Sequence, residues 1–175
     1  MESISHKGTS PWGNDPSYKI FRNVKDFRAK GDGVTDDAKA INEALADGKR
    51  CGEACNGSTT KSAIIYFPPG EYLESSPIET HFGSQLVGNA NDRATIKAAS
   101  SFVGLGMIST DVYVAGVGTD GKDNEWFVTT ANFYRQIRNF KLDITDTDPE
   151  AGICALRYQV ESYPPRSLAN SCRLE

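Results

Sequence analysis

The sequence is poor in features that mark several large classes of protein. Its two histidines, His6 and His81, lie far apart, so a zinc site is not expected. No apolar run approaches the roughly 18 residues that a membrane-spanning helix needs. Its 19 basic and 23 acidic residues give a net charge of -4 without any basic run. We therefore expect no metal, no cofactor, no nucleic-acid partner and no membrane span.

The N-terminal segment also lacks a recognisable targeting signal. "MESISHKGTSPWGNDPSYKIF" is polar and contains prolines, without the apolar stretch of a signal peptide. We expect residues 1–19 to form an arm outside the core. The 175 residues are enough for one domain with a sizeable core and short for two.

An acidic, glycine-containing segment leads into the single helical pattern of the chain. In residues 32–37, "DGVTDD", the Asp-x-Asp-x-Asp-Gly order and distant Glu of a calcium loop are absent. The segment is instead typical of a helix start, with Thr35 as the predicted N-cap and Asp36 and Asp37 in the first turn. The helix should end near Gly48. Four apolar residues recur at helical spacing on its buried face: Ala38, Ile41, Ala44 and Leu45.

Short apolar segments broken by Gly, Asn, Ser or Pro follow the helix. They are "SAIIYF", "YLESSPIE", "SQLVGN", "ATIKAA", "GLGMIST", "FYRQIRNFKLDIT" and "GICALRYQV", with an expected loop insertion at 114–130. Strands this short, unevenly spaced and without Asn-Gly hairpin turns favour stacked coils of a parallel β-solenoid over a sandwich. An amphipathic helix across the first coil would cover its open apolar end.

The cysteines leave one question open. Cys51 and Cys55 lie in the short polar loop "RCGEACNGSTTK". A Cys-x3-Cys pair without further ligands is a poor metal motif, and either a disulfide or two free thiols fits the spacing.

The opening segment "NVKDFRAKGDGVTDDAKAINEAL" resembles the first motif of the pectate-lyase-like right-handed β-helix superfamily. The segments "RCGEACNGSTTKSAIIYFPPGEYLESSPI", "QLVGNANDRATIKAASSFVGLGMISTDVY" and "FYRQIRNFKLDIT" are similar to the N-terminal part of fungal glycoside hydrolase family 55, the β-1,3-glucanases. The resemblance covers roughly residues 10 to 160. It implies an all-β fold, a right-handed parallel β-helix with one N-terminal capping helix.

The resemblance also implies a function. Members of the family are similar to two joined β-helices and are extracellular, inverting hydrolases of β-1,3-glucan, with the general-acid glutamate in the second β-helix. The first β-helix places a glutamine near the attacking water, and "RYQVES" puts Gln159 in that position here. An ordinary polar residue at a strand end is the alternative for Gln159. Five acids show no spacing of a catalytic pair and are expected on the solvated surface: Glu71, Glu74, Glu79, Asp143 and Glu161.

This sequence departs from the family pattern at several points. Arg28 stands where the motif usually has glycine, and "ESYPPRSLANSCRLE" diverges after Val160. We expect an incomplete fragment that lacks the general acid, divided into an arm (1–19), a β-helix portion (20–165) and a divergent tail (166–175). Its expected partners are β-1,3-glucan and either a second β-helix or another copy of the chain.

Two other functions remain open at this stage. One is a pectate-lyase-like or polygalacturonase-like enzyme on the same fold, and the other is a polysaccharide-binding module without catalysis. Trp126, Tyr134 and Tyr158 could stack on sugar rings in either case, although packing within the protein is the more common use of each.

Overall fold

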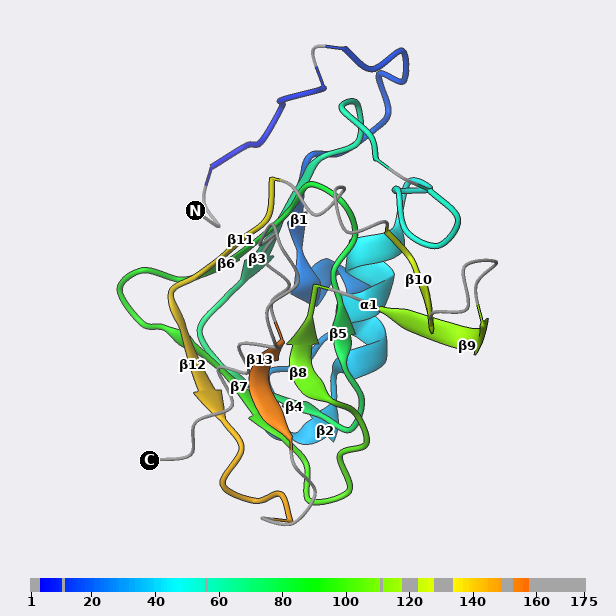
Figure 1. Ribbon diagram of the computed structural model, residues 1–175. Helices are drawn as coiled ribbons and strands as arrows, with labels where there is room; N and C mark the ends of the chain where they lie inside the picture. Colours follow the sequence, from blue (N-terminus) through cyan, green and yellow to red (C-terminus); the bar gives the residue numbers. More distant parts are fainter. Residues whose placement is uncertain are drawn as a thin grey trace.

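The computed structural model describes residues 4–10, 12–55, 57–110, 112–117, 123–127, 134–148 and 153–157. Figure 1 shows its elements along the chain. The first part comprises β1 (Phe21–Asn23), the 3-10 helix η1 (Val24–Phe27), β2 (Asp32–Asp36) and α1 (Ala38–Ala46). The strands β3 (Ala63–Phe67), β4 (Glu71–Glu74), β5 (Ile78–Glu79), β6 (Ser84–Gly88), β7 (Ala94–Ala98) and β8 (Gly106–Ser109) follow. The last are β9 (Tyr113–Val117), β10 (Asp123–Glu125), β11 (Gln136–Arg138), β12 (Phe140–Asp143) and β13 (Cys154–Arg157).

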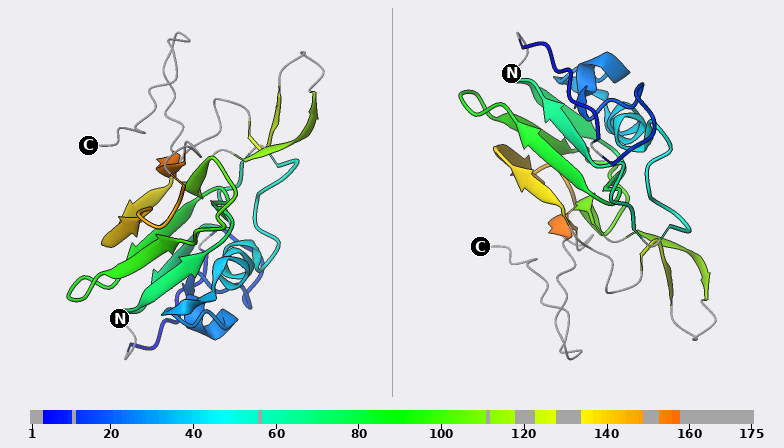
Figure 2. Two further views of the ribbon diagram at one scale, coloured as in Figure 1. Left: turned by 90° about the horizontal axis from the view of Figure 1, so that it is seen from below. Right: turned by 90° about the horizontal axis from the view of Figure 1, so that it is seen from above.

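Three parallel sheets form the body of the protein. The first sheet has the order β1-β3-β6-β11, the second β12-β7-β4-β2 and the third β13-β8-β5. The chain visits the three sheets in turn and then returns to the first, one strand further along. Figure 2 shows the resulting stack from two sides. The prediction of an all-β chain with one α-helix is confirmed for the described residues, whose strands lie mostly in parallel sheets.

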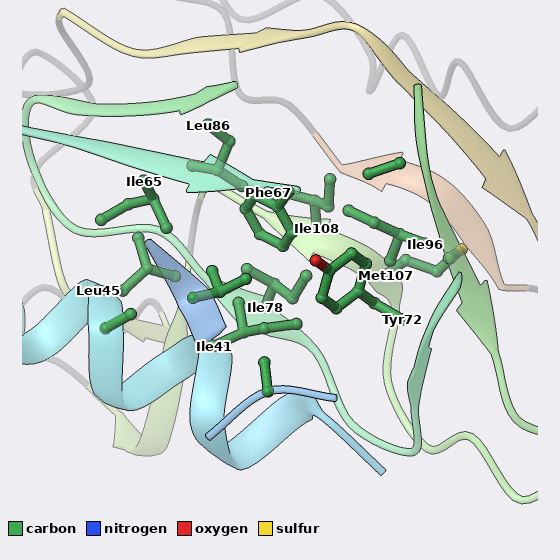
Figure 3. Packing of buried hydrophobic residues seen from close by; sticks show 14 of the residues in the cluster. Ile41, Leu45, Ile65, Phe67, Tyr72, Ile78, Leu86, Ile96, Met107 and Ile108 are labelled. Carbon is green, nitrogen blue, oxygen red and sulfur yellow. The ribbon is translucent and has the colours of Figure 1, made fainter. Parts of the chain in front are cut away.

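The core lies between the sheets, where each strand points alternate side chains inward. Figure 3 shows side chains from several strands meeting Ile41 and Leu45 of α1. The fully buried large apolar residues include Ile65, Phe67, Tyr72, Ile78, Leu86, Ile96, Met107 and Ile108. Because they come from all three sheets, the sheets and α1 share one hydrophobic core.

Helix α1 occupies the place of a missing strand. The third sheet has three strands and begins with β5, whose free edge faces α1. Asn42 of α1 accepts a bond from the backbone N–H of Glu79 (2.9 Å) and donates one to the carbonyl of Pro77 (2.9 Å). One side-chain amide thus satisfies both kinds of edge group, as a neighbouring strand would. The predicted buried face is confirmed, since Ala38, Ile41, Ala44 and Leu45 are all buried.

The predicted start of this helix is wrong in detail. Residues 32–36 form β2, and Asp37, not Thr35, is the N-cap residue. The Thr35 hydroxyl donates to Asp32 (2.9 Å), so it does not cap the helix. The buried Asp37 carboxylate accepts from the backbone N–H groups of Lys30 (2.6 Å) and Gly31 (2.8 Å). The acids of "DGVTDD" therefore bind backbone and hydroxyl donors.

Two further expectations concern single segments. Arg28 has φ 77°, a left-handed conformation that glycine adopts without strain, which agrees with its glycine-like place in the motif. The expected loop insertion at 114–130 overlaps β9 and includes β10, and these strands form an antiparallel pair that projects from the stack in Figure 2.

Candidate functional site

A small groove lies along the third sheet, and we call it the β5–β8 groove. Its volume is about 150 Å³, and it is lined by Pro77, Glu79, Leu105, Gly106, Ser109, Val112 and Tyr113. Strands β5 and β8 form its floor, paired in parallel with Glu79 opposite Ser109. Val112 and Tyr113 reach it from the start of the projecting hairpin. Residues from three separate chain segments therefore share one surface.

Glu79 supplies the one carboxyl group among the lining residues. Ile78 points into the core and is fully buried, so the next side chain, Glu79, points to the outer face, where it is half-buried. Burial raises the pKa of the Glu79 carboxyl above its usual range. Its backbone is fixed by Asn42 of α1, described above. At a given pH this carboxyl is therefore protonated to a greater extent than an ordinary surface glutamate.

The rest of the groove wall is largely apolar. Tyr113 is 40% exposed and Leu105 is 63% exposed, so both present apolar surface to a ligand. Ser109 is buried, and its carbonyl accepts bonds from the Thr80 backbone N–H (2.9 Å) and hydroxyl (3.1 Å). An exposed aromatic ring next to a carboxyl group suits a ligand with both apolar faces and hydroxyl groups.

The remaining predicted surface acids have different environments. Glu71 is exposed and lies 3.9 Å from the Lys97 ammonium, as expected for a surface residue. Asp143 accepts bonds from the Thr145 backbone N–H (2.9 Å) and hydroxyl (2.6 Å), which lower its pKa. Glu79 is half-buried, so the expectation of a solvated side chain is only partly met. Glu161 lies outside the described residues.

For Glu74 the surface prediction is wrong. Glu74 shares the inward face of β4 with Tyr72, and both are 0% exposed. Within the described residues, neither of its carboxyl oxygens has a hydrogen-bond partner. Burial, and to a lesser extent the negative charge of Asp36, raises the pKa of Glu74 well above its usual range. The side chain is enclosed in the core, so it cannot reach a substrate in the groove.

A second group of aromatic residues packs around the cysteine loop. Cys51 and Cys55 form a disulfide, which answers the question left open by their spacing. Cys51 packs with Phe82, Phe127 and the half-buried Trp126 in a small cluster of their own. Cys154 on β13 is also disulfide-bonded.

His81 belongs to the same region. Its ring stands edge-to-face against Trp126 with a centroid distance of 5.1 Å. Burial, reinforced by the charge of Arg50, lowers the pKa of His81 to about 4. Its imidazole is therefore neutral at physiological pH. Trp126 thus packs within the protein, which is the more common of its two predicted roles.

Three predicted residues lie apart from the groove or cannot be placed. Tyr134 is 75% exposed and makes an edge contact with Phe82 at 6.2 Å. Gln159 and Tyr158 lie outside the described residues. Across the described ranges, no three His, Cys, Asp or Glu side chains gather in a way that could hold a metal ion.

Residues 21–167 match the rhamnogalacturonase A/epimerase, pectate lyase-like family. The chain belongs to this family. Its three-sheet parallel architecture agrees with the pectate-lyase-like class. None of the helices among the described residues is long and apolar enough to cross a membrane.

Three relatives are similar to this chain over about 160 residues. The chain is 52% identical over 160 residues to "Non-secreted LysM effector LysM19" of Penicillium expansum, covering 91% of this chain and 12% of that protein. It is 44% identical to the "Probable glucan endo-1,3-beta-glucosidase" of Arthroderma benhamiae (91% and 18% covered). It is 42% identical to the "Glucan 1,3-beta-glucosidase" of Cochliobolus carbonum (90% and 20% covered).

These matches confirm the resemblance to the N-terminal part of fungal β-1,3-glucanases that the motifs indicated. The chain spans between 12% and 20% of the length of these three relatives. It therefore corresponds to a small part of each.

Proposed function

We propose that this chain is the N-terminal portion of a β-1,3-glucan-directed glycoside hydrolase and contributes a glucan-binding surface to it. The observation that carries the proposal is the β5–β8 groove, where the half-buried Glu79 lies beside the exposed Tyr113. The names of the 42% and 44% identical relatives supply the substrate class. The pyranose face would pack on Tyr113, and Glu79 would hydrogen-bond to its hydroxyl groups.

In this proposal the groove binds the sugar, and the two chemical groups that inverting hydrolysis needs lie elsewhere. Such hydrolysis requires a general acid on one side of the sugar and a group that activates water on the other. We therefore assign the general acid to sequence outside residues 1–175, and Gln159 to positioning the attacking water. On this proposal residues 1–175 bind glucan without cleaving it.

The proposed architecture is a right-handed parallel β-helix, with an arm at 1–19, the coils at 20–165 and a divergent tail at 166–175. The succession of first, second and third sheets supports it. So does the general right-handedness of crossover connections between parallel strands. A second β-helix, or another copy of the chain, would cover the remaining open end.

We also propose an extracellular location. The Cys51–Cys55 disulfide suits an oxidising compartment. The name of the Penicillium relative contains the word "non-secreted". Detection of the protein in culture medium and in cell extract distinguishes the two locations.

Retention on insoluble polysaccharide tests the substrate class. We expect residues 1–175 to bind β-1,3-glucan and not polygalacturonate. Tyr113→Ala should weaken binding about tenfold, as the loss of one aromatic contact does. Val34→Ala is the matched control, because Val34 is an exposed apolar side chain outside the groove. Retention on polygalacturonate alone would favour a pectinase-like enzyme, and no retention on either would refute the proposal.

A further inference from the structure

A second pocket lies in the N-terminal arm, away from the β5–β8 groove. We call it the arm pocket, and its volume is about 170 Å³. One side is lined by arm residues, and Thr60 and Lys61 of the segment before β3 line the other. The arm residues are Ser10, Trp12, Gly13, Asn14, Asp15 and Tyr18. In Figure 1 the arm extends beyond the upper end of the three sheets. The pocket shares no lining residue with the groove.

Several contacts hold the walls of this pocket in place. Tyr18 is buried, and its hydroxyl donates to the carbonyls of Lys61 (2.8 Å) and Ser62 (3.2 Å). The backbone N–H of Gly13 donates to the carbonyl of Ser10 (3.1 Å), which closes a turn on the arm side. The Lys61 ammonium donates to the carbonyls of Gly48 (2.7 Å) and Lys49 (3.2 Å). The arm is thus tied to the segment before β3.

Trp12 is the distinctive residue of the arm pocket. Its side chain is 77% exposed, although an indole buries more apolar surface than almost any other side chain when it is packed. The aromatic cluster around Cys51 shows that the protein does pack its other tryptophan, Trp126. An exposed indole beside a pocket with fixed walls offers a flat apolar face to a ligand.

The polar groups around Trp12 indicate what kind of ligand fits. Asp15 accepts bonds from the Ser17 hydroxyl (2.5 Å) and backbone N–H (2.9 Å), and these bonds lower its pKa, so it is ionised at neutral pH. Both bonds end on Oδ1, and Oδ2 can accept a hydrogen bond from a ligand hydroxyl. Asn14 adds an amide that can donate and accept. A pyranose ring has the matching chemistry, with C–H groups on its face and hydroxyl groups around its rim.

We infer that the arm pocket is a secondary glucan-binding subsite in which Trp12 stacks on one sugar ring and Asp15 binds its hydroxyls. The pocket is smaller than the 300–1,000 Å³ typical of sites for drug-sized ligands, so it takes a single ring of a longer chain. The choice of β-1,3-glucan as the polymer rests on the proposed function. On a polymer, two separate weak subsites raise retention through their high effective concentration.

Intrinsic fluorescence tests the inference directly, because the chain has two tryptophans. In a Trp126→Phe background, Trp12 is the sole fluorescent indole. Laminarihexaose should quench or shift its emission, and maltohexaose at the same concentration should not. In the wild-type background, Trp12→Ala should lower retention on insoluble β-1,3-glucan about tenfold. Unchanged Trp12 emission at saturating laminarihexaose would overturn the inference.

The same experiment separates this subsite from the proposed function. If Trp12 emission does not change with laminarihexaose but Tyr113→Ala lowers retention, the subsite proposal is wrong and the proposal for the β5–β8 groove stands. If Trp12 responds to laminarihexaose while Tyr113→Ala has no effect, the subsite stands and the groove assignment is wrong. An equal response to maltohexaose would contradict the assigned β-1,3 linkage preference and so refute the subsite as stated.

Discussion

The buried Glu74 should make the stability of this protein fall as the pH rises above the acidic range. An unfolded glutamate ionises near its ordinary pKa of about 4.3. In the folded protein, burial among core side chains raises the pKa well above 4.5, so Glu74 keeps its proton there. The native state consequently binds one more proton than the unfolded state between the two pKa values.

The sign and size of the effect follow from proton linkage. One extra proton on the native state lowers the free energy of unfolding by about 1.4 kcal/mol for each pH unit of increase. The stabilisation is fully present below the unfolded pKa and is lost as the pH rises toward the folded pKa. Asp143 has the opposite effect. Its lowered pKa contributes stability near neutral pH, and this contribution is lost only as the pH falls into the strongly acidic range.

Urea unfolding at about pH 5, 6, 7 and 8 measures this dependence. Glu74→Gln keeps the shape and removes the titration, so its unfolding free energy should lose the downward slope, which is about 1.4 kcal/mol per unit wherever the pH lies between the unfolded and folded pKa values of Glu74. Glu74→Leu also removes the buried polar oxygens and should be more stable than wild type by about 1–3 kcal/mol near neutral pH.

Glu71→Gln is the matched control. Glu71 lies on the same strand but is exposed, so its variant should keep the wild-type slope. The difference between the wild-type and Glu74→Gln curves isolates Glu74 from all other titrating groups. Parallel curves for these two proteins would refute the argument, because they would mean that Glu74 ionises equally in both states.

Four other outcomes follow from the structure. Asp37→Ala should cost about 2–3 kcal/mol because the backbone N–H groups of Lys30 and Gly31 lose their acceptor. Thr35→Ala should change the urea midpoint little, and equal losses in the two variants would contradict this ranking. Arg28→Gly should raise the free energy of unfolding by about 1 kcal/mol, since φ 77° strains an arginine, and a lower value would indicate that the arginine side chain contributes contacts. Replacing Cys51 and Cys55 together by Ser should cost about 2 kcal/mol for so short a loop, and alkylation of both thiols in unreduced protein would show that no bridge forms. Purified residues 1–175 should release no glucose from laminarin above a buffer control. Hydrolysis that survives removal of host glucanase would point to Glu79 as a working acid. The same protein should elute as an oligomer or aggregate in size-exclusion chromatography.

Local patterns in the sequence predicted the main elements because each depends on nearby residues. The helical spacing of Ile41 and Leu45 reports a buried face directly. The short apolar segments likewise became strands, and Arg28 revealed a left-handed position through the motif around it. Glu74 also left a local signal, since it stands two positions after Tyr72 on the same face of β4. The charge of Glu74 predicts exposure, whereas the alternation along β4 correctly predicts burial.

The remaining features depend on contacts that form only when the chain is folded. Asp37 could be recognised as the acceptor for Lys30 and Gly31 only once the loop before β2 was folded. The groove depends on the register that sets Glu79 beside Ser109, which the irregular segment lengths do not reveal. The role of Asn42 is similar, because a polar residue on a helix is normally expected to face water.

The Asn42 bridge closes one end of the stack of strands, so further strands can add only at the other end. Because the amide of Asn42 already holds the Pro77 carbonyl and the Glu79 N–H, no further strand can add to β5 on that side. Any further turn of chain must add at the opposite end of the stack, next to β11, β12 and β13. During translation the end of the stack that carries α1 is synthesised first. Each later turn can then pair with strands that are already folded. Long proteins of this kind can therefore fold one turn at a time from the N-terminus during synthesis.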